Sequence, residues 1–212
     1  MANETNERLR KLSAGSWLGA PSKTVREPHI HPRKKASNVR LIRWAVLAAL
    51  LGASFALSAE PKVQVGFSPE GSAKELVLET IGGAKQSIQM LAYAFQAPDI
   101  MQALVEARKR GVTVRVVVDK KRNQGKASKA AMDFVTRNGV ELRTNSHFHI
   151  HHDKTIIADG ATVQTGSFNY AESAETVNSE NVLVIRDMPE VSRRYLAHWQ
   201  SRWDLGSPYA AR

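Results

Sequence analysis

The sequence predicts an α/β fold in which a mixed β-sheet is sandwiched between helices. From about residue 60 onward, short runs of β-branched residues alternate with longer amphipathic patterns that are typical of helices. One run, Val112–Val118, has the valine-rich composition of strands buried inside a sheet. The chain has 212 residues, 42% of them hydrophobic, which is enough for one domain of ordinary size with its own core.

The first 59 residues differ from the rest in composition. Residues 1–40 are polar, basic and without periodicity, and they are predicted to form a disordered extension. Residues 41–59 contain an uncharged run rich in Ala and Leu, Trp44–Ala59, which follows Arg40 and Arg43 and ends in small residues. A basic stretch, an apolar run and a small-residue end together are typical of a secretory signal peptide.

This N-terminal segment leaves alternatives open. Its apolar run is shorter than the roughly 20 residues that a spanning helix needs, which favours a cleaved signal and a periplasmic or secreted protein. If Trp44–Ala59 stayed uncleaved, it would anchor the protein in the inner membrane. Signal peptides normally begin a chain, so either the native start lies downstream, for example at Val39, or a cytoplasmic extension precedes an anchor.

Residues 60–212 are predicted to form the folded domain. Val63–Phe67 alternates like a strand, and Ser72 with Glu75 forms the capping box of a helix that continues to about Lys85. The remaining predicted elements are strand Ser87–Phe95, helix Ala97–Arg110, strand Val112–Val118, helix Lys126–Asn138, strand Val140–Thr144, strand Asn181–Ile185 and helix Met188–Trp203.

Composition excludes some kinds of site and leaves others open. The chain has no cysteine, which excludes disulfides, zinc–thiolate sites and iron–sulfur clusters. The formal net charge is +10, but residues 1–59 carry +7 of it, so residues 60–212 are only mildly basic. Charge alone is therefore a weak argument for a nucleic-acid partner of the folded domain.

The candidate catalytic residues lie in the stretch from His152 to Glu180. Two apolar runs flank Asp159-Gly160, which predicts a hairpin with an Asp-Gly turn. Side chains two apart on a strand point the same way, so His152 and Lys154 are expected to share one face and Asp159 to lie on the other. A histidine beside a fixed cation suits a phosphate group, whereas Asp159 is expected to have a structural role.

Three further residues of this stretch fit the same chemistry. Ser167 and Asn169 follow the hairpin and could donate hydrogen bonds to phosphate oxygens. Glu180 opens the next predicted strand, and its carboxylate could hold the ring of His152 in one tautomer.

The spacing of these residues resembles the motif of the phospholipase D superfamily. That motif reads H-x-K, four residues, D, six residues, G-S and then an asparagine. The matching residues are His152, Lys154, Asp159, Gly166, Ser167 and Asn169. Within the superfamily, residues 61–209 resemble the small plasmid-encoded, EDTA-resistant bacterial endonucleases in the segments VQVGFSPEGSAKELVLETI, APDIMQALVEARKRGV and HWQSRW.

The resemblance implies a phospholipase D-like fold and a metal-independent phosphodiesterase with no cofactor. One histidine would form a covalent phosphohistidine while a second acts as acid and then as base. The implied catalytic residues are His152, Lys154, Ser167, Asn169 and Glu180, with Asp159 and Gly166 as structural members of the motif. The chain holds one such HKD-type motif, so a homodimer with the site on its two-fold axis is expected.

The expected substrate is nucleic acid, DNA first and RNA second. The loop after the predicted strand Val112–Val118 reads KKRNQGK, and its position suits a ligand crevice. The predicted contacts to the phosphate backbone are Lys120, Lys121, Arg122 and Lys126. Aromatic residues flank the motif and could stack on bases or pack in the core; they are Phe148, Phe168 and Tyr170.

The sequence also fits two other interpretations of function and raises the question of a metal site. A phospholipase or transphosphatidylase would use the same chemistry at a membrane, and a catalytically idle dimer could bind nucleic acid through the basic loop. His147, His149 and His151 alternate in sequence, so on a strand they would form a three-histidine face, a candidate for metal ligands. No functional metal is expected, since Lys154 already supplies a cation.

Overall fold

The computed structural model describes residues 62–211. The predicted extension of residues 1–40 and the predicted signal or anchor of residues 41–59 lie outside this range. Within residues 62–211, every helix is too short or too polar to cross a membrane.

One mixed sheet of eight strands runs through the described domain. Its order is β1-β7-β6-β5-β2-β3-β4-β8. Strands β2, β3 and β4 are parallel, and all other neighbours are antiparallel. The bounds are β1 Lys62–Ser68, β2 Ser87–Ala92, β3 Thr113–Asp119, β4 Glu141–Asn145, β5 Lys154–Ala158, β6 Thr162–Gly166, β7 Glu180–Arg186 and β8 Ser207–Pro208.

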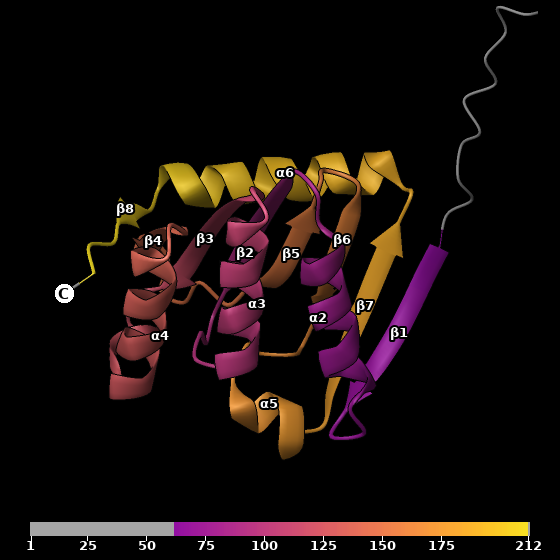
Figure 1. The fold of residues 1–212 in the computed structure, drawn as a ribbon, viewed down its shortest axis with the longest axis horizontal. Coiled ribbons are helices and arrows are strands. Elements are labelled where there is room, and N and C mark those ends of the chain that lie inside the picture. The colour runs from indigo at the N-terminus through magenta and orange to yellow at the C-terminus, as the bar shows by residue number, and fades with distance from the viewer. Residues whose placement is uncertain (1–61, 212) are drawn as a thin grey trace, which may run out of the picture. The chain divides into compact units, whose positions relative to one another are not determined.

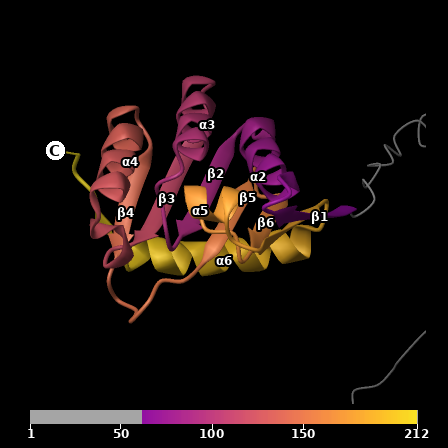
Figure 2. The same cartoon turned by 90° about the horizontal axis from the view of Figure 1, so that it is seen from below.

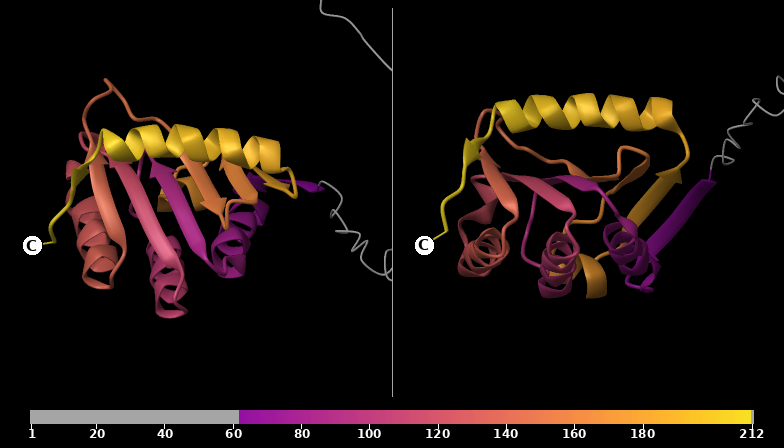
Figure 3. Two further views of the ribbon diagram at one scale, coloured as in Figure 1. Left: turned by 90° about the horizontal axis from the view of Figure 1, so that it is seen from above. Right: turned by 45° about the horizontal axis from the view of Figure 1, so that its top comes forward.

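Helices cover both faces of the sheet, which confirms the predicted α/β sandwich (Figures 1 and 2). Helices α2, α3 and α4 lie on one face, and the long helix α6 crosses the strands on the other (Figure 3). The bounds are α2 Ser72–Gly83, α3 Pro98–Lys109, η1 Arg122–Gln124, α4 Lys126–Arg137, α5 Glu172–Thr176 and α6 Pro189–Asp204.

Each face of the sheet has its own apolar core. The larger core lies under α2, α3 and α4, where Ile88, Val116 and Ile156 are fully buried. The smaller core lies under α6 and contains Leu91, Val117, Ile157, Val163 and Trp199. Adjacent residues of β2, β3 and β5 thus belong to opposite cores, because successive side chains of a strand point to opposite faces.

Local signals explain most helix boundaries, with one correction. Pro98 occupies the first turn of α3, and Gly111 and Gly139 follow α3 and α4 with φ of 92° and 85°. The capping box predicted at Ser72 is wrong. Ser72 is the first residue of α2, and its hydroxyl accepts a hydrogen bond from the N–H of Phe67 instead.

The predicted hairpin is present as β5 and β6. Its turn contains Asp159 with φ of 54° and Gly160 with φ of 64°, the left-handed conformation that an Asp-Gly pair adopts readily. The carboxylate of Asp159 accepts three backbone N–H bonds, from Lys85, Gln86 and Ser87, at 2.7–2.9 Å. Partial burial raises the pKa of Asp159, but these hydrogen bonds lower it below its usual value overall. Asp159 thus fixes the start of β2 to the hairpin.

Candidate active site

The motif residues gather where the parallel strands end. Strand β2 ends at Ala92, which pairs with Lys154, the first residue of β5. The next residue, Tyr93, donates its N–H to the carbonyl of Asp153 at 2.9 Å. In open α/β sheets, ligands bind outside the carboxyl ends of the strands, so this edge is the expected place for a site.

His152 does not lie on a strand, contrary to the prediction. The segment 146–153 has no strand structure, because the pairing of β5 with β2 ends at Lys154. The side chain of His152 is exposed, and its ring meets the ring of Tyr93 edge-on with centroids 4.5 Å apart. Within residues 62–211, the ring nitrogens of His152 have no hydrogen-bond partner, so they are available to a ligand.

Lys154 is a buried cation beside His152. Lys154 is only 6% exposed. Its ammonium donates a hydrogen bond to the backbone carbonyl oxygen of His152 at 2.8 Å. The ammonium also lies 5.1 Å from the centre of the Tyr93 ring. Burial lowers the pKa of Lys154, while the nearby carboxylates of Glu180 and Asp153 oppose that shift. A phosphate group at this position would gain a strong, poorly screened attraction.

Glu180 makes different contacts from those predicted. One of its carboxylate oxygens accepts the hydroxyl of Ser167 at 2.6 Å, and the other accepts the amide of Asn178 at 2.9 Å. Its described hydrogen bonds therefore go to Ser167 and Asn178, and the ring of His152 receives none of them. Ser167 in turn accepts the backbone N–H of Asn181 at 3.0 Å, which ties the motif to β7.

Gly166 and Asn169 complete the motif on the same edge. Gly166 has φ of 147°, and a Cβ built there would lie 2.2 Å from the carbonyl oxygen of Asn181, so only glycine fits. Asn169 is half-buried, and its side-chain Oδ1 has no hydrogen-bond partner within residues 62–211. A buried amide oxygen without a partner is costly, and because this oxygen only accepts hydrogen bonds, a bond from Asn169 to a phosphate oxygen requires its amide nitrogen.

The basic loop is anchored at the same edge of the sheet by two buried polar residues. Asn123 is fully buried, accepts the N–H of Phe95 and donates to the carbonyls of Tyr93 and Asp119. Asp119 accepts the N–H of Arg122 with one carboxylate oxygen and that of His151 with the other. These bonds hold the loop against the motif segment.

Of the four predicted backbone-binding residues, the structure brings Arg122 to the site. Its guanidinium lies 5.8 Å from the centre of the Tyr93 ring, which also meets the His152 ring edge-on and has the Lys154 ammonium over its face. The side chains of Lys120, Lys121 and Lys126 are exposed. Within the described part of the chain, these three make no hydrogen bond or ion pair with a motif residue.

The three alternating histidines do not form a shared face. Their segment is not a strand, so His147 and His149 are exposed while His151 is buried. Among residues 62–211, no group of three or more His, Asp or Glu side chains is placed to hold a metal ion.

The aromatic residues divide between surface and core. Phe168 and Tyr170 are fully buried, so the stacking role considered for them is wrong. Phe148 is half-buried, with the guanidinium of Arg202 4.8 Å from its ring centre. Trp199 stacks on Trp203 at 5.1 Å in the smaller core, as core packing requires.

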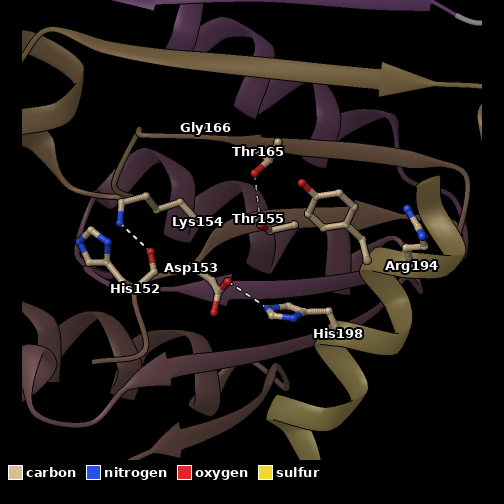
Figure 4. Close-up of a pocket in the computed structure, with 9 residues that line it drawn as sticks. His152, Asp153, Lys154, Thr155, Thr165, Gly166, Arg194 and His198 are labelled. Atoms are coloured by element: carbon tan, nitrogen blue, oxygen red, sulfur yellow. Dashed lines mark hydrogen bonds and ion pairs between the residues drawn. The ribbon is translucent and has the colours of Figure 1, made fainter. Parts of the chain in front are cut away.

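Sequence reasoning missed a group of residues from outside the motif. Tyr93 belongs to the predicted buried strand Ser87–Phe95, yet its ring lies against His152, Lys154 and Arg122. A cavity of about 460 Å³ opens beside the motif, and helix α6 forms its other wall (Figure 4). The cavity is lined by His152, Asp153, Lys154, Thr155, Thr165, Gly166, Arg194, Tyr195 and His198.

His151 should make the fold less stable in acid. It is 2% exposed, and both ring nitrogens lack hydrogen-bond partners within residues 62–211. Burial lowers the pKa of His151 overall, although the negative charges of Asp153 and Asp119 oppose that shift. The imidazole of His151 therefore binds a proton more readily in the unfolded chain than in the folded one. As a result, the free energy of unfolding falls as pH drops below about 6.5.

The His151→Leu variant removes this titration, so we expect a flatter dependence of its unfolding free energy on pH below about 6.5. Urea denaturation at several pH values measures the difference from the unmodified chain. His149→Leu, at an exposed position, is the control and should keep the original slope. An unchanged slope in His151→Leu would contradict the assignment.

Comparisons with known proteins agree with this fold and motif. A family model described as "Cardiolipin synthase, PLD-like domain" matches residues 77–203. Phospholipase D of Rickettsia bellii is 36% identical over 141 residues, which are 66% of this chain and 69% of that protein. Nuc from Salmonella typhimurium, a phospholipase D family member of known structure, is 57% identical, with a TM-score of 0.70 over 71% of this chain and 99% of that one.

A more distant solved structure supports the fold alone. NucT from Helicobacter pylori is 22% identical, with a TM-score of 0.62 over 71% of this chain and 100% of that chain. Together, fold, motif and relatives define a phosphodiesterase-type hydrolase. The chain belongs to the phospholipase D superfamily, which confirms the family indicated by the spacing of the motif.

Proposed function

We propose that this phosphodiesterase is a nuclease that cleaves DNA, and RNA by the same chemistry, with little sequence preference and without a metal ion. The observation that carries the proposal is the exposed ring of His152 beside the ammonium of the largely buried Lys154, with the Arg122 guanidinium 5.8 Å from the centre of the Tyr93 ring that lies close to both. Phosphate contacts of this kind bind a nucleic-acid backbone but read no sequence.

In the proposed mechanism, His152 attacks phosphorus. A phosphorus–nitrogen bond forms as the bond to the leaving oxygen breaks, and a second histidine gives that oxygen a proton. The second histidine then takes a proton from water, whose oxygen attacks phosphorus and releases His152. Lys154 and the amide of Asn169 stabilise the charged phosphoryl oxygens, while Glu180 holds the hydroxyl of Ser167 in place.

The second histidine is proposed to come from a second copy of the chain. Each chain has one His-x-Lys motif, and His152 is exposed at the edge of the domain where a partner could approach. A homodimer with its two-fold axis through the site would bring two copies of His152 and Lys154 to one phosphate.

Mixed dimers test this arrangement. If each site needs both histidines, refolding equal amounts of the unmodified chain and His152→Ala together should leave about a quarter of the activity of the same total amount of unmodified protein. Independent sites would leave about half. The control mixture with His149→Ala, an exposed histidine, should keep full activity. A loss of only half in the His152→Ala mixture would contradict the shared site.

A lipid phosphodiesterase is the second candidate. The matching family model carries the name of cardiolipin synthase, and the Rickettsia bellii relative is named a phospholipase D. Plasmid DNA and cardiolipin vesicles, each offered to the purified protein in excess EDTA, separate the two candidates. Cleavage of DNA but not of cardiolipin is expected, and the reverse outcome would replace the nuclease proposal.

We also propose that residues 41–59 direct export and that residues 60–212 are the mature nuclease domain. Export would place the enzyme in the periplasm, where it could degrade incoming nucleic acid. N-terminal sequencing of the protein made in cells should begin at Glu60. A mature protein that keeps Trp44–Ala59 would instead indicate the membrane anchor.

A further inference from the structure

One wall of the cavity is formed by helix α6, which lies outside the motif. Arg194, Tyr195 and His198 come from this helix, and they face the motif side of the same 460 Å³ cavity. Figure 4 shows Lys154 at one end of the cavity and Arg194 at the other, with His198 on the same helix. If one group of a ligand binds at Lys154, the α6 side of the cavity therefore stays open to a neighbouring group of the same ligand.

The side chain of Arg194 has no ion pair within residues 62–211, whereas that of its neighbour Arg193 has one. Arg193 forms an ion pair with Glu190 one turn earlier. Arg194 is exposed and, among residues 62–211, has no hydrogen bond or ion pair. Its planar guanidinium can bind a phosphate group with two parallel hydrogen bonds.

His198 is held in a fixed orientation at the same wall. Its Nε2 lies 3.0 Å from a carboxylate oxygen of Asp153, the residue between His152 and Lys154. This contact ties α6 to the motif segment and leaves the other ring nitrogen of His198 for a ligand. Asp153 is the one acidic residue that lines the cavity, and it is already turned to His198.

The types of residue that line the cavity favour an anionic ligand. Every lining residue except Gly166 is polar or charged, and the cations Lys154 and Arg194 outnumber the single carboxylate. An apolar ligand would need a largely hydrophobic lining. A nucleic-acid strand, in contrast, carries a phosphate at every nucleotide, about 3.4 Å apart along the helix axis.

We propose that Arg194, with Tyr195 and His198, forms a second phosphate subsite that holds the phosphate next to the one being cleaved. The inference rests on the proposed nuclease function and extends it, because it makes the enzyme favour a polymer over a single phosphodiester. Arg194 is a binding residue in this proposal and takes no part in the bond changes at His152.

Two substrates separate this subsite from the reaction centre. Bis(4-nitrophenyl) phosphate has one phosphodiester and no neighbouring phosphate, whereas a short oligodeoxynucleotide has many. For Arg194→Ala, the KM for the oligonucleotide should rise about tenfold, the effect of losing one charge-assisted phosphate contact. Its kcat/KM for bis(4-nitrophenyl) phosphate should stay within about twofold of the unmodified protein, which also reports that the variant is folded.

Arg193→Ala is the matched control. It removes the same charge one residue away, from a side chain that pairs with Glu190 and does not line the cavity. Binding of the oligonucleotide in a His152→Ala background gives a second readout that needs no cleavage. There, adding Arg194→Ala should reduce the slope of log affinity against log salt by about 0.7, and adding Arg193→Ala should not.

Each outcome decides a different point. Equal effects of Arg194→Ala and Arg193→Ala on the oligonucleotide would overturn the subsite, since only general charge would then matter. Equal losses on both substrates would also overturn it, because Arg194 would then act at the reaction centre or on the fold. If the unmodified protein cleaves bis(4-nitrophenyl) phosphate but neither binds nor cuts the oligonucleotide, the nuclease function itself fails.

Discussion

Replacing His152 with alanine is expected to lower the rate of plasmid DNA cleavage in excess EDTA by at least about 10⁴-fold. The proposed mechanism has no route around the phosphorus–nitrogen bond that this side chain forms. The exposed ring packs against Tyr93 and has no hydrogen-bond partner within residues 62–211, so its loss should cost little stability. Supercoiled plasmid loss on gels, with the thermal midpoint of unfolding measured in parallel, checks both points.

His149→Ala provides the matched comparison for this variant. His149 is also an exposed histidine, three residues earlier in the same segment, and it does not line the cavity. It should cleave DNA at the unmodified rate. Residual cleavage in His152→Ala within about tenfold of the unmodified protein would exclude His152 as the nucleophile.

Local patterns predicted much of this fold because they act over a few residues. Helices α3 and α4 were located to within one residue at either end, since Pro98, Gly111 and Gly139 mark their ends chemically. The Asp159-Gly160 turn was predicted on the same basis. The short elements α5 and β8 were not predicted, because neither carries a periodicity or a turn signal of its own.

The site was predicted only in part because tertiary contacts complete it. The spacing of the motif gave His152, Lys154, Ser167 and Asn169, but the alternation of a strand cannot reveal where its partner strand ends. The chain leaves the sheet at Lys154, and His152 therefore lies outside it. The contacts of Glu180 with Ser167 and Asn178 likewise depend on how β7 lies against β6.

Residues far from the motif were missed for a related reason. Tyr93 reaches the site because β2 ends there, and Arg194 and His198 reach it because α6 crosses the sheet (Figures 3 and 4). Their patterns are those of an ordinary strand end and an ordinary amphipathic helix. A buried Asn123 explains why the basic loop is fixed, yet in sequence it is one polar residue among several.

Lys154→Met is expected to lower kcat for DNA cleavage by about 10²–10³-fold, the usual cost of removing one preorganised group that stabilises developing charge. Methionine keeps most of the length and apolar volume of lysine, so the packing against Tyr93 should survive. Lys154 as a residue is only 6% exposed, and the lower local dielectric strengthens the attraction of its ammonium for a phosphoryl oxygen. Single-turnover cleavage of an oligonucleotide in excess EDTA measures the change.

Arginine at the same position separates charge from geometry. Lys154→Arg keeps the positive charge, but the larger, planar guanidinium must fit where the residue is 6% exposed and the Tyr93 ring lies 5.1 Å from the ammonium. We therefore expect partial recovery, with a rate between those of Lys154→Met and the unmodified protein. Lys129→Met, an exposed lysine on α4, is the control for loss of one charge. If Lys154→Met cleaves as fast as Lys129→Met, the buried ammonium does not act on the phosphoryl group, and its role is confined to holding the carbonyl of His152 in place.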